Sequence, residues 1–421
     1  MPRLPPPLLR DAARQHRFLP RLLRECRDLP SAQNELRWLK EHAVETCRNR
    51  NHDIRDRGWS TRVLDKRVAQ RLTRYVDRRA RGEPLQYILG TQPFGDVEIL
   101  CQKGVLIPRR DTETYTTRVA ELLKEIVPSN VDEQRPNLRV LDLCTGTGCI
   151  SLLLHSMLRP PGSIGSKSRQ GPSAEAQSSL SIVGVDISTV ALELARENLN
   201  HNINQGHLHP EAAHEVSFHQ VDLLCLDQQN GNDPITGNVS HDIEQKRYSE
   251  TRSILGRLVN RTVDDDDTWD VIVSNPPYIS PKQYAPGGTT ARSVRNHEPK
   301  LALVPLAHDS GHSPKEQNLQ DSGDSFYAPL LRTAEAVEAK LLVMEVGDCE
   351  QAFRVGLMVK DFMHSHGQEA LLEIWRDDGT VITSPDWRPS VNAEDQSASA
   401  RAVVAWKGEW LPWRRSTLSG H

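Results

Sequence analysis

The sequence predicts an α/β protein whose central sheet is mostly parallel. After residue 138, short apolar runs alternate with helical patterns, the order expected when parallel strands are joined by right-handed helical crossovers. A glycine-rich turn follows the first apolar run, and an aspartate or asparagine follows several of the later ones. Open sheets of this kind bind ligands at the carboxyl ends of their strands, so a ligand site is expected at that edge.

Composition disfavours several other protein classes. The chain has 421 residues, of which 37% are hydrophobic and 26% charged, so it can bury the cores of two or three domains. No apolar run approaches the roughly 18 residues of a membrane span. The net charge of −4 gives no general attraction to nucleic acid. The seven cysteines are scattered without zinc-type spacing, which indicates reduced thiols and no metal site.

An arginine-rich helical domain is expected within residues 1–81. Ser31 can cap a first helix over residues 32–43, and residues 61–80 repeat apolar side chains at helical spacing. Residues 1–24 contain six arginines and a single acid. That composition suits either an organelle transit segment or a cationic helix of the domain itself.

A β-hairpin linker is predicted over residues 82–110, where glycine and proline turn signals recur, and a larger α/β domain over residues 111–421. The expected strands of that domain span residues 139–143, 182–186, 216–221, 271–273, 341–346, 371–375 and 402–406. The last two of these form a terminal hairpin, which fits the antiparallel edge of a seven-stranded sheet. Polar stretches that lack apolar residues are expected to be surface insertions. They span residues 159–180, 226–268 and 308–325.

The segment from Asn275 to Tyr278 places a rigid loop directly after the expected strand at residues 271–273. Pro276 and Pro277 cannot donate backbone hydrogens, so they stop the sheet ladder. The Asn275 carboxamide oxygen and the Pro276 carbonyl can each accept one N–H of a planar NH2 group, while the Tyr278 ring packs against it. The loop therefore predicts a binding site for an amino group, although the same residues also suit a simple strand-ending turn.

A glycine turn connects the first strand to its helix. Gly146 and Gly148 allow the backbone to approach a ligand closely, and the helix that follows offers unpaired N–H groups. Ser151 stands where a dinucleotide fingerprint has its third glycine, which weakens an interpretation as an NAD site. The other loop residues expected at the ligand are Cys144, Thr145 and Thr147.

Three aspartates at strand ends complete a predicted adenosyl site. Asp186 ends the second strand and is placed to accept both ribose hydroxyls of an adenosyl ligand. Asp222 follows the third strand and could accept a hydrogen bond from an adenine amino group. Asp142, in the first strand, could orient the glycine loop or reach the amino-acid part of the ligand. Each aspartate alone could instead cap a helix, but their ordered series predicts an adenosyl cofactor.

These residues resemble the class I S-adenosylmethionine-dependent methyltransferases, and the loop at Asn275 is similar to their amino-methylating signature. Enzymes that act on adenine, guanine and glutamine share that signature. The flanking segments are similar to those of HemK/PrmC-type release-factor glutamine methyltransferases, over residues 30–410 apart from the insertions. The segments that carry this resemblance are residues 82–90, 106–113, 275–279, 298–303 and 345–347.

The resemblance implies a Rossmann-like sheet, a small N-terminal helical domain that docks the substrate, and S-adenosyl-L-methionine as cofactor. It also implies methylation of the side-chain amide nitrogen of the glutamine in the Gly-Gly-Gln motif of a peptide chain release factor. Arg109 and Glu113 would contact the peptide unless they form a structural ion pair. Asn275 would face both cofactor and substrate. The residues that would form the catalytic loop are Asn275, Pro276, Pro277 and Tyr278.

Two residues depart from the family pattern. Cys144 stands where the family loop usually has its first glycine, and Arg110 stands where a proline is common. A cysteine costs little there if its φ is negative, so we expect the cofactor loop to be retained. Arg110 leaves the local geometry of its segment open.

Two alternatives compete with the glutamine hypothesis. A nucleic-acid amino-methyltransferase would use the same loop on adenine or guanine, but the polar and partly acidic insertions lack the basic module that it needs. A catalytically idle adenosyl-binding scaffold would not require a loop that binds an NH2 group. We therefore expect a release factor as partner, no direct nucleic-acid substrate, a monomeric protein, and a mitochondrial rather than a cytoplasmic location.

Overall fold

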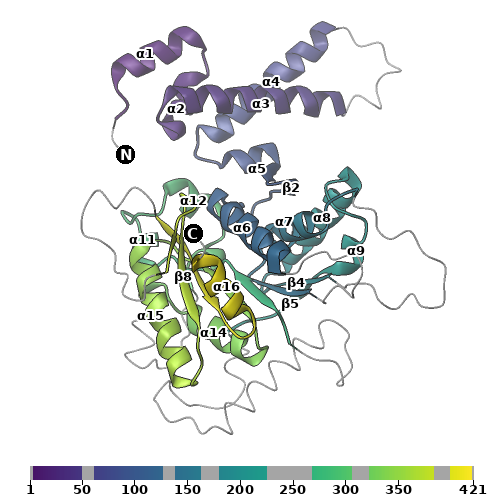
Figure 1. The fold of residues 1–421 in the computed structure, drawn as a ribbon. Coiled ribbons are helices and arrows are strands. Elements are labelled where there is room, and N and C mark those ends of the chain that lie inside the picture. Colours follow the sequence, from purple (N-terminus) through teal and green to yellow (C-terminus); the bar gives the residue numbers. More distant parts are fainter. Residues whose placement is uncertain are drawn as a thin grey trace, which may run out of the picture. The chain divides into compact units, whose positions relative to one another are not determined.

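The structure, a computed structural model, describes residues 3–49, 61–126, 138–162, 180–224, 268–305, 322–383 and 399–419. Two compact units divide the chain (Figure 1). The helical unit comprises residues 1–92, 101–103 and 290–298, and the α/β unit comprises residues 93–100, 104–289 and 299–421. The boundary differs from the expected one, because residues 82–92 belong to the helical unit and are not part of a separate linker.

Long helices with leucine-rich inner faces build the helical unit. Its helices are α1 (Pro6–Gln15), α2 (Leu19–Cys26), α3 (Leu29–Asn49), α4 (Thr61–Arg79), α5 (Leu85–Leu89) and α12 (Arg292–His297). Leu22, Leu23 and Leu39 are fully buried in its core, and Ala12 of α1 joins them there. The arginine-rich start contributes α1 and α2 to this unit.

Local predictions for the helical unit need two corrections. Asp28, and not Ser31, caps α3: its carboxylate accepts from the Ser31 N–H at 2.8 Å, which lowers the pKa of Asp28. Residues 85–89 form helix α5 and not a strand, and Gly90 ends it with a φ of 85°. The predicted hairpin is confirmed only over β1 (Thr91–Phe94) and β2 (Val97–Leu100).

Part of the arginine content of the helical unit is structural. Arg79 binds Glu35 through two hydrogen bonds of 2.8 and 2.9 Å, and Arg78 binds Glu83 through two of 2.8 and 2.7 Å. Such bidentate pairs hold their side chains in one geometry. The Arg78 guanidinium lowers the pKa of the Glu83 carboxyl to about 2.

An eight-stranded sheet forms the centre of the α/β unit. Its strands are β3 (Leu138–Leu143), β4 (Leu180–Asp186), β5 (Val216–Gln220), β6 (Val271–Ser274), β7 (Leu341–Glu345), β8 (Leu371–Arg376), β9 (Val381–Ile382) and β10 (Ala400–Trp406). Their order is β5-β4-β3-β6-β7-β10-β8-β9, with β3 to β7 parallel and β10 antiparallel to both of its neighbours. The expected seven strands are all present. The sheet has one strand more than predicted, the two-residue β9.

Helices cover both faces of this sheet, as Figure 1 shows. The first face packs against α6 (Arg110–Ile126), α7 (Cys149–Leu158), α8 (Thr189–Gln205), α9 (Ala212–Glu215) and α16 (Trp410–Ser419). The second face packs against α14 (Tyr327–Ala336) and α15 (Cys349–Ser365). Short elements α11 (Pro281–Tyr284) and η3 (Lys300–Ala302) follow β6. The two apolar layers leave the strand ends available for a site.

Asparagines of α8 hold β2 to the α/β unit. The Asn202 side chain accepts from the Glu98 N–H at 2.9 Å and donates to the Glu98 carbonyl at 2.8 Å. Asn198 accepts from the Leu100 N–H at 2.6 Å and donates to the Thr147 carbonyl at 3.0 Å. The two side chains thus replace a neighbouring strand and tie β2 to the glycine loop.

The polar stretches lie mainly outside the described residues, and one prediction about them was wrong. Residues 322–325 are not a surface insertion, because Asp324 is 2% exposed. Its carboxylate accepts from Arg354 at 2.6 Å and from Gln351 at 2.9 Å, both on α15. Over the described ranges, no helix is long and apolar enough to cross a membrane, and no acidic, His or Cys cluster could hold a metal ion.

Candidate active site

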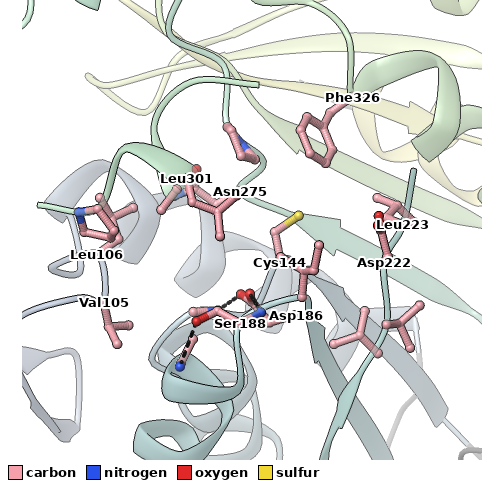
Figure 2. Close-up of a pocket in the computed structure, with 18 of the residues that line it drawn as sticks. Val105, Leu106, Cys144, Asp186, Ser188, Asp222, Leu223, Asn275, Leu301 and Phe326 are labelled. Atoms are coloured by element: carbon pink, nitrogen blue, oxygen red, sulfur yellow. Dashed lines mark hydrogen bonds between the residues drawn. The ribbon is translucent and has the colours of Figure 1, made fainter. Parts of the chain in front are cut away.

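A cavity lies at the carboxyl ends of β3, β4, β5 and β6 in the α/β unit (Figure 2). The space inside it and in its open mouth together amounts to about 910 Å³. Polar groups from four strand ends line it, namely Gly146, Asp186, Asp222 and Asn275. The apolar part of its lining includes Val105, Leu106, Leu223, Leu224, Leu301 and Phe326. An apolar slot with a few polar groups suits a flat heterocycle joined to a polar chain.

The glycine loop between β3 and α7 packs closely against the Phe218 side chain of β5. Gly148 has a φ of 79°, and a Cβ there would lie 2.9 Å from the Phe218 ring, so a larger residue has no room. Gly146 has a φ of 55°, and nothing lies within 4 Å of the place where its Cβ would be. That open space above Gly146 is a cradle where a ligand can approach the backbone.

Cys144 does not meet the condition on which its low cost was predicted. Its φ is +64°, not negative, so this cysteine adopts the left-handed conformation that glycine usually supplies. Its side chain lines the cavity, as Figure 2 shows. Burial and the charge of Asp186 raise the pKa of the Cys144 thiol, which keeps it protonated. The loop therefore holds a non-glycine residue in a strained, left-handed conformation.

Asp186 and Asp222 reach the cavity from neighbouring strands. The Asp186 carboxylate accepts from the Gly146 N–H and from the Ser188 N–H, each at 2.9 Å (Figure 2). Burial raises the pKa of Asp186, and these backbone donors oppose that effect. Asp222 accepts from the Leu224 N–H at 3.0 Å. Each carboxylate has four acceptor positions, so both can still accept from a ligand.

The two carboxylate oxygens of Asp142 differ in their hydrogen bonds: one accepts several and the other accepts none from the described residues. Its Oδ2 accepts from the Thr145 hydroxyl at 2.6 Å and from the Ser151 hydroxyl at 2.7 Å. Its Oδ1 is buried and has no partner among the described residues. Burial raises the pKa of Asp142 to about 6. An unsatisfied buried acceptor beside the loop fits a ligand that brings a donor, directly or through water.

The loop after β6, residues 275–278 (the acceptor loop), begins at Asn275, whose carboxamide is held by a hydrogen bond. Asn275 Nδ2 donates to the Thr112 hydroxyl at 3.3 Å, and that hydroxyl donates to Glu345 at 2.6 Å. Asn275 Oδ1 and the Pro276 carbonyl receive no hydrogen bond from any residue that the structure describes. Asn275 and Pro277 line the cavity. Two unused acceptors therefore follow β6 beside a cavity that suits an adenosyl group.

Tyr278 is fixed at both of its polar ends. Its hydroxyl donates to Glu345 at 3.1 Å, and its carbonyl accepts from Gln351 at 3.1 Å. Its ring packs against Gly347, where a Cβ would lie 3.2 Å from the ring atoms. Burial and the nearby Glu345 charge raise the pKa of the Tyr278 phenol, while Arg109 opposes the shift. The aromatic face at this position is rigid and uncharged.

The other predicted residues have more local contacts. Arg109 lies near enough to Tyr278 for its charge to act on the phenol, and the Arg109 carbonyl accepts from the Glu113 N–H at 3.1 Å at the start of α6. Arg110 is the first residue of α6. Thr145, Thr147 and Gly148 shape the loop without lining the cavity.

Several residues of the site were not predicted. Thr112 and Glu345 lie inside segments that resemble the family, but the sequence assigned them no role. For Glu345, the sequence signal was an acidic residue at the end of an otherwise apolar strand, because a buried acid needs hydrogen-bond partners. Phe326 lines the cavity and directly follows a stretch that was expected to be an insertion.

Comparison with known proteins identifies a family of similar sequences. Residues 21–90 match a family model described as the PrmC N-terminal domain, and residues 134–249 match a methyltransferase domain. A probable mitochondrial MRF1 N(5)-glutamine methyltransferase of Schizosaccharomyces pombe is 31% identical over 322 residues, which cover 74% of this chain and 78% of the relative.

Two further relatives carry similar names. The mitochondrial MRF1 N(5)-glutamine methyltransferase of Saccharomyces cerevisiae is 28% identical, over 72% of this chain and 68% of the relative. A release factor glutamine methyltransferase of Haemophilus influenzae is 37% identical, over 59% of this chain and 62% of the relative. The predicted resemblance is therefore confirmed, and the chain belongs to the family of HemK/PrmC-type release-factor glutamine methyltransferases.

Proposed function

We propose that this protein transfers a methyl group from S-adenosylmethionine to the side-chain amide nitrogen of a glutamine in a peptide chain release factor. The observation that carries the proposal is the pair of unused acceptors, Asn275 Oδ1 and the Pro276 carbonyl, in a loop that lines the cavity through Asn275 and Pro277. A primary amide has two N–H donors in one plane, and two fixed acceptors match them. The names of the relatives agree with this chemistry.

Residues around the cavity suit the cofactor. Asp186 would accept from the ribose hydroxyls, Asp222 would accept from the adenine amino group, and Leu223 with Phe326 would enclose the ring. The amino-acid end would lie over Gly146, and the buried Asp142, which does not itself line the cavity, would reach its ammonium group through a bridging water. When bound, S-adenosylmethionine supplies a methyl group made electrophilic by a positively charged sulfur.

The chain contributes orientation and charge stabilisation. An amide nitrogen is a weak nucleophile because its lone pair is delocalised into its carbonyl. Asn275 and Pro276 hold both N–H bonds, which aims the nitrogen and stabilises positive charge as that charge grows on it. Tyr278 supplies a rigid face against the amide plane. The proton leaves the nitrogen to water after methylation, so no strong general base is needed in advance.

The partner and location follow from the same resemblance. We propose that the modified residue is the glutamine of a Gly-Gly-Gln motif in a mitochondrial release factor, because two yeast relatives are named mitochondrial MRF1 methyltransferases. The helical unit would dock that factor. We also propose that the protein acts as a monomer and that nucleic acid is not its substrate.

The test is methyl transfer from a radiolabelled donor to a purified mitochondrial release factor, with ribosomal RNA and DNA in parallel reactions. We expect label in the release factor alone, and its loss when the motif glutamine is changed to alanine. Label confined to nucleic acid would refute the proposal. Bound cofactor without label in any acceptor would instead indicate a binding scaffold.

Asn275→Ala should lower kcat by about a hundredfold or more, as removal of one charge-stabilising group does in other enzymes. Its affinity for S-adenosylmethionine, measured by calorimetry, should stay within about threefold of wild type, because one cavity contact is replaced by a methyl group. Asn204→Ala, at an exposed position of α8, is the matched control and should leave both values unchanged. Full turnover by Asn275→Ala would remove Asn275 from its assigned role.

A further inference from the structure

We propose that Thr112 and Glu345 are positioning residues that orient the Asn275 carboxamide and thereby select a glutamine amide over a carboxylate. The inference rests on the proposed function and deepens it. Thr112 lies on α6 and Glu345 ends β7, 233 residues further along the chain. Both are buried, with exposures of 1% and 2%. Neither lines the cavity, so both act through Asn275.

Burial raises the pKa of Glu345, and the hydrogen bonds that it accepts oppose this shift. With Glu345 ionised, the order of donors in this chain of hydrogen bonds has one solution. The Thr112 hydroxyl lies 2.6 Å from Glu345 Oε2, and its single hydrogen is used in that bond because a carboxylate can only accept. The Thr112 oxygen can then only accept from its other neighbour. The Asn275 atom that faces it at 3.3 Å must be the Nδ2 donor. Asn275 Oδ1 is therefore directed away from Thr112, free to accept from a substrate.

Glu345 organises both ends of the acceptor loop. Its Oε2 holds Thr112, and its Oε1 accepts from the Tyr278 hydroxyl at 3.1 Å. The buried Tyr115 hydroxyl, also on α6, faces the same carboxylate without meeting hydrogen-bond geometry. One carboxylate thus fixes the amide acceptor and the aromatic face together. A neutral or shorter side chain at Glu345 would release both.

This arrangement explains how the site distinguishes an amide from an acid. A glutamine side chain presents two N–H donors to the two acceptors, Asn275 Oδ1 and the Pro276 carbonyl. A glutamate side chain would place a carboxylate against the same two oxygens and would be repelled. If the Asn275 amide turned over, its Nδ2 would face the substrate, and part of that repulsion would become attraction. Thr112 prevents the turn.

The test compares Thr112→Val, which has nearly the same shape without a hydroxyl, with Thr112→Ser, which keeps it. Thr112→Val should lower kcat by about 10- to 100-fold, the range for loss of a hydrogen bond to a charged group. Its KM for release factor and its affinity for S-adenosylmethionine should stay near wild type, because neither docking nor the cavity changes. Thr112→Ser should recover most of the rate.

Thr116→Val is the matched control. Thr116 is also buried on α6, one turn further on, but its hydroxyl donates to the Thr112 carbonyl within the helix. The same loss of a hydroxyl there should leave kcat unchanged. Glu345→Gln, which keeps the shape of the side chain, replaces one acceptor by a donor and should lower kcat as Thr112→Val does.

A specificity measurement separates positioning from general damage. A release factor carrying glutamate in place of the motif glutamine should inhibit wild-type enzyme more weakly than an alanine-substituted factor does. Thr112→Val should lessen that difference, whereas simple loss of packing would weaken both inhibitors alike. An unchanged difference together with an unchanged kcat would overturn the proposal.

The orientation can also be read without turnover. In protein labelled with 15N-asparagine, the Asn275 side-chain N–H signal should exchange with solvent about tenfold faster in Thr112→Val than in wild type, because one hydrogen bond is lost. Equal exchange would refute the orientation. If wild-type enzyme labelled no release factor, the proposed function would fail, and this measurement would still decide how Asn275 is held.

Discussion

Replacing Cys144 tests the most unexpected backbone feature of the site. Cys144 follows β3 with a φ of +64°, a region in which a side chain contacts its own backbone. The family usually has glycine there. Cys144→Gly and Cys144→Ala both remove the same thiol, so its packing cancels when the two variants are compared. The difference in their free energies of unfolding reports the backbone conformation alone.

The magnitude follows from two opposing terms. A residue with a Cβ loses about 1–2 kcal/mol in the left-handed region relative to glycine. Glycine in turn gains flexibility in the unfolded chain and loses about 0.4–1 kcal/mol on that account. We therefore expect Cys144→Gly to be more stable than Cys144→Ala by about 0.5–1 kcal/mol. At ordinary helix or strand positions the order is reversed by a similar amount.

Unfolding by guanidinium, followed by tryptophan fluorescence, measures this difference. The two variants are compared when their unfolding free energies have the same dependence on denaturant concentration. The control is the same pair of substitutions at Cys149, the first residue of α7, where the backbone is helical and alanine should be the more stable. If Cys144→Gly were less stable than Cys144→Ala, the left-handed assignment would be wrong. The family glycine would then be explained by close approach of the ligand.

Two further predictions concern buried charges. Burial raises the pKa of Asp142 to about 6, so Asp142 is protonated below that pH and ionised above it. A cationic ligand group requires the ionised carboxylate. Affinity for S-adenosylmethionine should therefore fall by up to about tenfold per pH unit below 6, and Asp142→Asn should remove this dependence. Equal calorimetric pH profiles for wild type and Asp142→Asn would contradict the prediction. Arg414→Ala should cost about 3–5 kcal/mol of unfolding free energy, because it leaves the fully buried Glu373 without the partner that donates to it at 2.6 Å. The double variant Arg414→Met with Glu373→Gln should recover much of this in thermal denaturation, and a cost under about 1 kcal/mol for Arg414→Ala would show that water reaches the pair.

Most strands of the α/β unit could be predicted because they are short apolar runs, and β6 and β7 are buried at every residue. The run at residues 182–186 became β4 (Leu180–Asp186), and the run at residues 271–273 became β6 (Val271–Ser274). β9 has only two residues, which is too short to show any periodicity. Helix α6 was not predicted, although its apolar residues recur at helical spacing.

Residues of the site that follow strands could be predicted for a similar reason. Parallel strands end at one edge, so the order of Gly146, Asp186, Asp222 and Asn275 along the chain was enough to bring them to one cavity. Asp324 could not be placed this way. Its burial depends on Gln351 and Arg354 of α15, and a polar sequence gives no sign of such partners.

Sequence patterns alone predicted the strands of the sheet, the class of cofactor and a rigid loop at residues 275–278, because these depend on local periodicity and on residue chemistry at strand ends. Tertiary structure alone decided the sign of φ at Cys144 and the direction of the Asn275 carboxamide. Both depend on contacts between segments far apart in the chain. Asn275 has one orientation only because Thr112 and Glu345, which lie 233 positions apart in the chain, meet in the folded protein.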